Sequence, residues 1–368
     1  MELLHLLRWY KQYGGRRFSV LFGRGGELRS HFESLSETWS VDSSRWGPES
    51  LRTNLLIFAK LARLAHWAEA VGSRRFAGRV SPGVIYANSI GSAETVRLLA
   101  PNIPVVTHIH ELDFMIRAFW GPSLEYLFQR TTQFIACSHA VATNLSVNFG
   151  VDEARIDTVH EAIPVAEVRA GRSRDAVLRE LDIPQHALIV AGSGNLSWIK
   201  GHDIFVRLAH IMSRRCRGIY FVWVGGGSAW DRAQFEHDIR LANLTGLVRV
   251  TGTVRNPADY LAAADVFVLT SRQDSFPLVA LEAAAVGKPI VCFAGAGGLP
   301  EFVEDDCGCL APYLDAEAMA NRLTFLLASP DCRNRMGGAA RRKVGERHDI
   351  NIAAPKIARV IERTLEGT

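Results

Sequence analysis

The chain has 368 residues, of which 48% are hydrophobic and 22% charged, and its formal net charge at pH 7 is +4. This balance excludes a disordered chain, a collagen and a coiled coil, and the small surplus of positive charge is not that of a dedicated nucleic-acid binder. The length predicts two domains, each large enough to bury a core. No uninterrupted apolar run reaches the roughly 18 residues that a membrane-spanning helix needs.

The first residues predict a helix, with Leu3, Leu4 and Leu7 on one face. A core helix of the first domain is the favoured interpretation, and a basic helix lying on a lipid surface is the alternative. The first strand follows only at residues 18–22, whereas a doubly wound domain ordinarily opens with a strand. We therefore expect the sequence to start late, by roughly 15–25 residues, the length of one strand and a turn.

Strand-like apolar runs then alternate with amphipathic segments along the whole chain. Helices are predicted between the strands, for example at 201–213, 229–243 and 257–264. This alternation predicts an α/β fold with a parallel, doubly wound sheet in each half. The predicted strands are 18–22, 84–87, 105–109, 134–137 and 157–160 in the first half, and 188–191, 219–224, 248–251, 266–270 and 290–293 in the second.

A polar, arginine-rich stretch after Pro164 marks a domain boundary. We predict an N-terminal domain at 1–165, a C-terminal domain at 166–350 and a C-terminal amphipathic helix at 351–368, whose destination the sequence does not fix. Ligands of open α/β sheets bind at the carboxyl ends of the strands, so the loops that follow the strands should carry the chemistry.

The loop after residues 266–270 is the richest in such residues. It carries Asp274 in a polar turn, a helix is expected to begin around Pro277, and Glu282 lies about one and a half turns into that helix. Carboxylates in these places can accept hydrogen bonds from the hydroxyls of a sugar or ribose, and the exposed amides of the turn suit a phosphate. Alternatively, Glu282 is only a favourable charge near a helix start.

This block resembles the signature of retaining glycosyltransferases of family 4, a pattern like Glu-x-Phe-Gly-x-x-x-x-Glu. Asp274 and Glu282 occupy the acidic positions and Phe276 the aromatic one, and the match continues through 283–291 and 297–303. The resemblance implies the GT-B fold, in which two Rossmann-like domains face each other across a cleft.

It also implies that Asp274 contacts the donor sugar and Glu282 the ribose, while the turn around Ser275, Phe276 and Leu278 meets the diphosphate. The sequence departs from the pattern twice, with the shorter Asp274 in place of glutamate and Pro277 in place of glycine. Because the shorter acid reaches less far and proline supplies no amide, the preference for donor hydroxyls stays open.

A second candidate is the glycine-rich turn after residues 188–191, which contains Gly194 and leads to Lys200. Such a turn can approach a phosphate closely and Lys200 can supply the charge, although glycine is also ordinary turn punctuation. The resemblance implies that Lys200 is the phosphate-binding lysine. Asn195 stands near the place where many relatives carry an arginine, and Arg272 is the candidate replacement.

Two further segments resemble parts of the family's donor site. Arg255, in Thr253-Val254-Arg255, resembles the segment that borders the nucleobase, and Gly225-Gly226-Gly227 resembles a turn that lines the cleft. Surface turns explain both segments equally well.

In the first half, His108 and His110 lie at the carboxyl end of a strand, and we expect the pleat to face them in opposite directions. A histidine at a strand end is more often structural. The pair His110-Glu111, however, resembles the family's motif on the acceptor side, which implies that His110 lies near the anomeric carbon of the donor. Residues 86–89 and Ser138-His139 are expected to border the acceptor.

The six cysteines include no C-x2-C pair and indicate reduced, buried thiols. Cys307-Gly308-Cys309 is expected to be structural rather than a metal or redox site. No acidic pair resembles a metal-binding D-x-D, so we expect neither a metal nor any cofactor beyond the nucleotide-diphosphate sugar.

The sequence thus predicts a retaining, metal-independent hexosyltransferase that uses a UDP- or GDP-linked sugar, with His110, Lys200 and Asp274 as catalytic residues. The acceptor is a hydroxyl of a glycan, a lipid-linked glycan or a small molecule, and no nucleic acid is involved. A cytoplasmic protein is expected, with docking to the inner face of a membrane left open. The alternatives are a nucleotide-sugar epimerase and a non-catalytic protein that binds sugar nucleotides.

Overall fold

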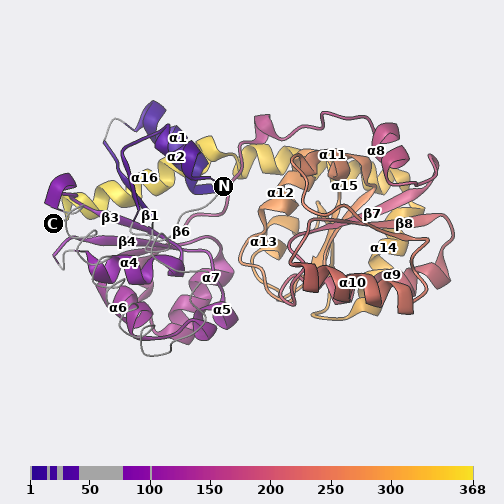
Figure 1. Cartoon of the computed structure of the whole chain (residues 1–368), viewed down its shortest axis with the longest axis horizontal. Coiled ribbons are helices and arrows are strands. Elements are labelled where there is room, and N and C mark those ends of the chain that lie inside the picture. The colour runs from indigo at the N-terminus through magenta and orange to yellow at the C-terminus, as the bar shows by residue number, and fades with distance from the viewer. Residues whose placement is uncertain (1, 15–16, 23–27, 41–77, 100–101, 368) are drawn as a thin grey trace, which may run out of the picture. The chain divides into compact units, whose positions relative to one another are not determined.

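The computed structural model describes every residue except 1, 15–16, 23–27, 41–77, 100–101 and 368. The chain divides into two compact units (Figure 1). Unit 1 consists of Met1–Ala136, Asn144–Val159 and Ala354–Thr368, and unit 2 of Cys137–Thr143 and His160–Ala353.

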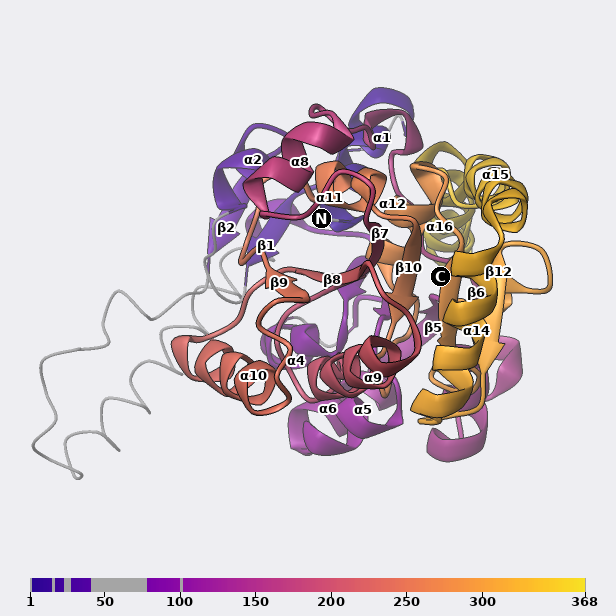
Figure 2. The ribbon, with the colours of Figure 1, turned by 90° about the vertical axis from the view of Figure 1, so that its right-hand side faces the viewer.

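Unit 2 is built on a six-stranded sheet in which every pair of neighbouring strands is parallel. The order is β12-β11-β10-β7-β8-β9, and Figure 2 shows β8, β7 and β10 side by side. Its strands are β7 (Leu188–Ser193), β8 (Ile219–Val224), β9 (Val248–Val250), β10 (Val266–Leu269), β11 (Ile290–Phe293) and β12 (Gly308–Ala311).

The chain winds outward from β7 in two directions, first through β8 and β9 and then through β10, β11 and β12. The strand order therefore reverses between β7 and β10, which are hydrogen-bonded neighbours. Such a switch point is where ligands bind in doubly wound sheets, because the loops that follow the two strands leave in opposite directions.

Helices cover both faces of the unit 2 sheet. Figure 1 shows α8, α11, α12 and α15 on one face, and α9, α10 and α14 on the other. Side-chain caps begin several of these helices, such as the capping box in which Ser228 and Asp231 satisfy each other's backbone amides at the start of α10. The helices are α8 (Arg174–Glu180), α9 (His202–Arg215), α10 (Ala229–Leu241), α11 (Pro257–Ala263), α12 (Leu278–Ala285), α13 (Leu299–Val303), α14 (Ala316–Ala328) and α15 (Pro330–Arg347), with α7 (His139–Thr143) from the other segment of the unit.

Aromatic side chains fill the space between the sheet and the α9–α10 face. Phe205, Trp223 and Phe235 are fully buried there, with their rings edge to face at 5.1 and 5.8 Å between centroids. Edge-to-face aromatic packing of this kind adds to the hydrophobic stabilisation, so the strands that carry the candidate loops rest on a rigid core.

The described residues of unit 1 form four parallel strands in the order β3-β4-β5-β6 and a separate parallel pair, β1 and β2. In Figure 1, α1, α2 and the second half of α16 lie on one side of these strands, and α4, α5 and α6 on the other. The strands are β1 (Val20–Phe22), β2 (Thr38–Ser40), β3 (Ile85–Asn88), β4 (Val105–Ile109), β5 (Thr131–Ala136) and β6 (Ile156–Thr158). The helices are α1 (Glu2–Tyr13), α2 (Arg29–Glu33), η2 (Ile90–Ser92), α4 (Ala93–Leu98), α5 (Asp113–Ala118) and α6 (Pro122–Arg130).

The first and last helices both pack into unit 1. In α1, Leu4, Leu6 and Tyr10 are buried, which favours a core helix over one that lies on a lipid surface. The C-terminal helix α16 (Ile350–Glu366) begins in unit 2, but its residues from Ala354 onward belong to unit 1, where Arg363 pairs with Asp157 at 2.5 Å. In the described part of the chain, no helix combines the length and apolar character required to cross a bilayer.

Every strand that the sequence predicts is present, with ends that differ by a few residues. Among the described strands, two were not predicted: β2, which has only three residues, and β12, whose sequence is Gly-Cys-Leu-Ala. Glycine and alanine are poor strand formers, but a Cβ at Gly308 would collide with the carbonyl oxygen of Ile290 on the neighbouring strand. Close strand approach, and not strand propensity, therefore explains β12.

Candidate functional site

A lysine and an aspartate meet at the switch point of unit 2. Lys200 follows β7 and Asp274 follows β10, and the Nζ of Lys200 lies 2.6 Å from Oδ2 of Asp274. The aspartate side chain is only 8% exposed and that of the lysine 30%. The Oγ of Ser271 also donates to Asp274, at 3.2 Å. The structure thus brings together two of the three predicted catalytic residues.

Backbone contacts place Lys200 at this point. The next residue, Gly201, has φ 66°, and a Cβ there would collide with the carbonyl oxygen of Thr270 at the end of β10. The Oγ1 of Thr270 donates to the carbonyl of Lys200 at 3.2 Å, and the amide of Arg272 donates to that of Ile199 at 2.7 Å. Only glycine allows the loops after β7 and β10 to lie this close.

The turn that carries Asp274 is fixed from its other side by the loop after β11. The amide of Asp274 donates to the carbonyl of Ala296 at 2.7 Å. The amide of Gly298 points back at the turn, 3.2 Å from the carbonyl of Asp274 and 3.1 Å from that of Ser275, whose side chain is half-buried. The carboxylate is therefore presented by a rigid main chain.

Gly194 lies under the stem of Lys200, where a Cβ would be 3.3 Å from Cγ of the lysine. Its carbonyl accepts a hydrogen bond of 3.0 Å from Nε1 of Trp223, and a Cβ at Gly225 would collide with the same carbonyl. The loops after β7 and β8 are thus in direct contact, and the predicted glycine turn belongs to the same edge as Lys200 and Asp274.

Glu282 lies in the middle of α12 and is half-buried. Burial raises the pKa of its carboxyl above the ordinary value. Within the described residues it makes no hydrogen bond or ion pair with Lys200 or Asp274. Its role toward a ribose stays a prediction. Pro277, expected as the first helical residue, is instead the N-cap residue of α12.

Other predicted donor residues are more peripheral. Arg272, the proposed substitute for a missing cation, is held by both oxygens of Asp203 at 2.8 and 2.6 Å and lies 4.9 Å from the ring of Trp198. In this arrangement its guanidinium is committed to the start of α9. Asn195 and Arg255 are exposed, and Leu278, the first residue of α12, is half-buried.

Phe276 is 3% exposed, and its ring stacks on that of His348 at 5.1 Å and meets the edge of His160 at 5.3 Å. The aromatic position of the motif therefore stabilises the turn from within the core. Any contact from Phe276 to a ligand must use its main chain.

Glu301, which sequence reasoning did not single out, holds three groups. Its carboxylate accepts hydrogen bonds from the backbone amides of His139 (2.9 Å) and Ala140 (2.8 Å) and lies 2.7 Å from Nε2 of His160. Burial alone would raise its pKa, but the hydrogen bonds from His160 and the two amides keep the pKa of Glu301 below the ordinary value. Only its place in the 297–303 match could have signalled it.

His139, His160 and Glu301 each present a potential metal ligand atom, all within 4.8 Å of one another. The hydrogen bonds already account for this geometry, since the carboxylate fastens the start of α7 and the ring of His160 to α13. Ser138, expected to border the acceptor, packs against Gly298 in the same unit, where a Cβ at the glycine would be 2.6 Å from that of the serine.

In unit 1, His108 and His110 lie at the end of β4. Their rings are 4.1 Å apart and inclined by 38°, so the expectation that they face opposite ways is wrong. Residues two apart in a strand point to the same side, and the strand ends at Ile109. His110 contacts Oδ1 of Asn88 at 3.1 Å, which joins the ends of β3 and β4.

His108 is a structural residue. It is 1% exposed, its Nδ1 lies 2.6 Å from the hydroxyl of Tyr86, and its Nε2 has no partner among the described residues. Burial, assisted by the neighbouring His110, lowers its pKa well below 6.5. It therefore stays neutral, and of the two histidines His110 is the one that remains accessible.

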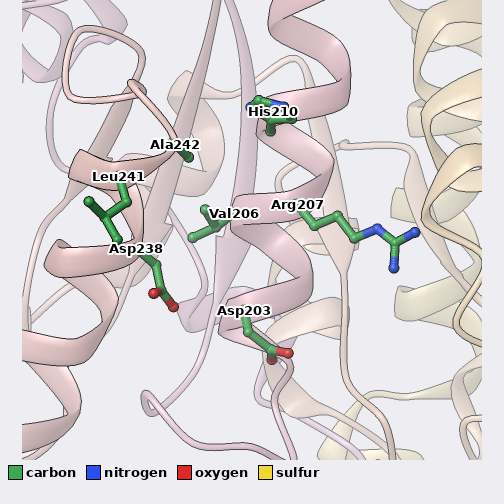
Figure 3. A pocket seen from close by; sticks show the side chains of 7 residues that line it. All are labelled: Asp203, Val206, Arg207, His210, Asp238, Leu241 and Ala242. Atoms are coloured by element: carbon green, nitrogen blue, oxygen red, sulfur yellow. The ribbon is translucent and has the colours of Figure 1, made fainter.

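A groove of about 350 Å³ lies between α9 and α10, away from the predicted site (Figure 3). None of the predicted site residues lines the groove, although Asp203, the partner of Arg272, does. Asp238, Arg207 and His210 give it mixed charge without a common focus.

The six cysteines are all unbridged, and Cys137, Cys292, Cys307 and Cys332 are buried. Burial raises the pKa of the Cys307 thiol to about 12 and that of Cys309 above its ordinary value. Neither thiol belongs to a potential metal cluster among the described residues. The structural interpretation of Cys307-Gly308-Cys309 agrees with this burial.

Glycosyltransferase family models match both halves of the chain. A family model described as glycosyl transferases group 1 matches residues 186–329, and one described as glycosyltransferase family 4 matches residues 17–167. The first match lies within unit 2, and the second covers most of unit 1 together with residues 137–143 and 160–167 of unit 2.

Several curated relatives are D-inositol 3-phosphate glycosyltransferases. The protein of that name from Streptomyces bingchenggensis is 31% identical over 253 residues, which is 66% of this chain and 55% of the relative. That from Streptomyces griseus is 33% identical over 233 residues, 56% of this chain and 49% of the relative. The chain thus matches about half the length of these relatives.

Solved structures share the fold over nearly the whole chain. A glycosyltransferase from Rickettsia africae has a TM-score of 0.74 at 15% identity and covers 100% of this chain and 95% of its own. Anabaena Alr3699/HepE, solved with UDP and glucose, has a TM-score of 0.76 at 19% identity and covers 98% and 95%. The GT-B fold expected from the resemblance is confirmed, and each half of the chain is similar to glycosyltransferases.

Proposed function

We propose that this protein transfers a sugar from a nucleotide-diphosphate sugar to a hydroxyl acceptor, with retention of the anomeric configuration and without a metal ion. The observation that carries the proposal is the contact of Lys200 with Asp274 at the switch point of unit 2. A cation and an acid at this place suit a molecule that has a diphosphate at one end and sugar hydroxyls at the other.

The chemistry requires that the leaving diphosphate be stabilised as its negative charge grows. The ammonium of Lys200 has three donors, of which one is directed at Asp274, and it can turn to the phosphate on its flexible stem. The amides of the turn around Ser275 are held in place by Gly298 and need no reorganisation during the reaction. Preorganised donors of this kind are a large term in enzyme catalysis.

Retention fits an attack from the face that the diphosphate leaves. The acceptor oxygen bonds to the anomeric carbon as the bond between that carbon and the diphosphate oxygen breaks. The proton of the acceptor hydroxyl passes to the departing phosphate. Asp274, the acid beside the lysine, is hydrogen-bonded to Lys200 and Ser271 and is suited to holding sugar hydroxyls rather than to forming a covalent intermediate. His110, which follows β4, is the third residue that we propose to be catalytic.

The test is incubation with UDP-, GDP- and ADP-sugars, with and without a mixture of hydroxyl acceptors. Three results would support the proposal. Release of nucleoside diphosphate should rise with the acceptor concentration, NMR should show the same anomeric configuration in the product as in the donor, and activity should persist in EDTA. An isomerised donor would indicate an epimerase instead, and binding without turnover a non-catalytic protein.

The acceptor class follows less directly. The curated relatives are named for D-inositol 3-phosphate, which makes a phosphorylated cyclitol the first acceptor to try. A glycan, a lipid-linked glycan and an unphosphorylated small molecule complete the panel.

A further inference from the structure

The donor turn, residues 274–278 after β10, is held by the residue that precedes α13. Gly298, the N-cap residue of α13, donates its amide to the carbonyls of Asp274 and Ser275 at 3.2 and 3.1 Å. Both hydrogen bonds would be lost if α13 moved away from the turn. The place of α13 therefore helps to set the place of Asp274.

The segment Cys137–Thr143 packs against the same glycine. A Cβ at Gly298 would collide with the carbonyl oxygen of Ser275 and would lie 2.6 Å from Cβ of Ser138. It would also lie 2.8 Å from Cδ2 of Phe276. Three stretches of unit 2, the donor turn, α13 and Cys137–Thr143, thus meet without room for one methyl group, and close packing of this kind transmits displacements.

One carboxylate joins two of these stretches. Glu301 of α13 accepts the amides of His139 and Ala140, which lie 162 and 161 residues earlier in the chain, at 2.9 and 2.8 Å. Burial alone would raise its pKa, but its hydrogen bonds keep the pKa below the ordinary value, so the group is charged at neutral pH. Hydrogen bonds to a charged acceptor are roughly twice as strong as neutral ones. The carboxylate therefore fixes Cys137–Thr143 firmly to α13.

The third partner of Glu301 reaches the donor turn through its ring. Nε2 of His160 lies 2.7 Å from Oε2 of Glu301, and the ring of His160 meets that of Phe276 edge to face at 5.3 Å. The imidazole of His348 stacks on Phe276 at 5.1 Å, and its Nδ1 lies 3.0 Å from the carbonyl oxygen of Glu161. Two imidazole rings, each oriented by a hydrogen bond, thus hold Phe276 in place.

These contacts connect Glu301 to the donor turn along two paths, one through Gly298 and one through His160. Within the described residues, Glu301 itself makes no hydrogen bond or ion pair with Lys200 or Asp274. Removal of its carboxylate should therefore displace the turn while leaving in place every group that is proposed to touch the donor.

We propose that Glu301 is a positioning residue for sugar transfer, whose carboxylate sets the place of Asp274 and of the donor-turn amides before the donor binds. The inference rests on the proposed function, since it takes the donor turn to meet the diphosphate and the sugar. It adds a residue of α13 that acts only through its neighbours.

The first test is binding of UDP to the full chain, measured by calorimetry. We expect Glu301→Ala to weaken binding by about tenfold, the scale of one hydrogen bond to a charged group, because the turn amides lose their alignment. Glu301→Gln keeps one carbonyl oxygen for a backbone amide and should bind UDP within about threefold of the wild type. Urea unfolding shows whether each variant is folded.

Glu180 on α8 provides the matched control. Its carboxylate also joins separate segments of unit 2, because it accepts the hydroxyl of Tyr260 at 2.7 Å and is paired with Arg172. Glu180→Ala should lower the urea midpoint and leave the dissociation constant of UDP unchanged.

Kinetics and hydrogen exchange separate positioning from general stabilisation. With the donor and acceptor that the wild type uses, Glu301→Ala should raise the KM for the donor by about tenfold and leave the KM for the acceptor unchanged. In the ligand-free chain, deuterium exchange should become faster over residues 272–278 and 137–143, while β7 and β8 keep the wild-type rate.

Wild-type affinity for UDP in a folded Glu301→Ala protein would overturn the proposal. An equal loss of affinity in Glu180→Ala, or faster exchange throughout unit 2, would do the same. If Glu301→Ala does not fold, Glu301→Gln is compared with Glu180→Gln, and equal UDP affinity in these two would also overturn it. Failure of the wild type to bind UDP or GDP would count against the proposed function, and the exchange measurement would still decide whether Glu301 positions the turn.

Discussion

The carboxyl edges of the two units are built in different ways. In unit 2, backbone hydrogen bonds and glycine contacts join the loops after β7, β8, β10 and β11 and leave Lys200 and Asp274 in contact. In unit 1, the amide of Ser89 donates to the carbonyl of His108 at 2.8 Å, and side chains make further joins, such as Asn88 with His110 and Tyr86 with His108. The exposed Phe119 lines a pocket with Ser89 and Glu111 at this edge.

This difference indicates what each edge can recognise. A main-chain site offers fixed amides and a cation, which suit a constant group such as a diphosphate, and it depends on glycines that no other residue can replace. A site lined by side chains can be changed by single substitutions without moving the fold. The edge of unit 2 should therefore be sensitive to small backbone changes, and the edge of unit 1 to changes of side-chain charge and volume.

Removal of the cation should have the largest effect. We expect Lys200→Ala to lower the rate of transfer by about 100-fold or more, because one preorganised donor to the leaving group is lost. Lys356→Ala, an exposed lysine on α16, is the control. Because Asp274 would lose its ion-pair partner, urea unfolding must first show that the Lys200→Ala protein is folded. Full activity in this variant would show that the contact of Lys200 with Asp274 is not needed for transfer.

The second-largest effect is expected when a methyl group is added at Gly201. Because φ is 66° and the added Cβ meets the carbonyl oxygen of Thr270, Gly201→Ala should destabilise unit 2 by roughly 2–4 kcal/mol and weaken UDP binding. Gly246→Ala, where a Cβ has open space, should change neither quantity. Equal stability of the two variants in urea would contradict a backbone-built donor edge.

Glu282→Gln should separate function from stability. The raised pKa of Glu282 means that its charged form is disfavoured in the folded protein. Its ionisation therefore lowers the free energy of unfolding at neutral pH, but not below the pKa that the carboxyl has in the unfolded chain. The variant should lose turnover yet melt at a higher temperature at pH 7, with no gain near pH 4. A loss of both activity and stability at pH 7 would assign Glu282 a structural role.

The smallest effect is expected in unit 1, at His108. The pKa of His108 is lower in the folded protein than in the unfolded chain, where it is near 6.5. The neutral imidazole therefore costs no stability above pH 6.5, and the free energy of unfolding decreases as the pH falls below 6.5 toward the folded pKa. His108→Gln cannot be protonated and should lose less unfolding free energy between pH 7 and pH 5 than the wild type. His139→Gln, at an exposed histidine, is the control, and identical pH dependence in the wild type and His108→Gln would refute the argument.

Periodicity and spacing in the sequence predicted much of this protein. Runs of apolar residues predicted every strand that has such a run. The spacing of seven residues between Asp274 and Glu282 predicted that one acid lies in a loop and the other in a helix. The same alternation puts His108 and His110 on one side of the chain, because residues two apart in a strand point the same way. Short strands such as β2 carry too few residues for a pattern.

Contacts between distant segments were decided only by the tertiary structure. The commitment of Arg272 to Asp203, the burial of Phe276 between His160 and His348, and the three hydrogen bonds of Glu301 each join residues far apart in sequence. Local pattern reports which face of an element is apolar, but not which partner an exposed polar group will find. Those partners are set by the close approach of loops at the sheet edge, where a glycine such as Gly201 fixes the distance.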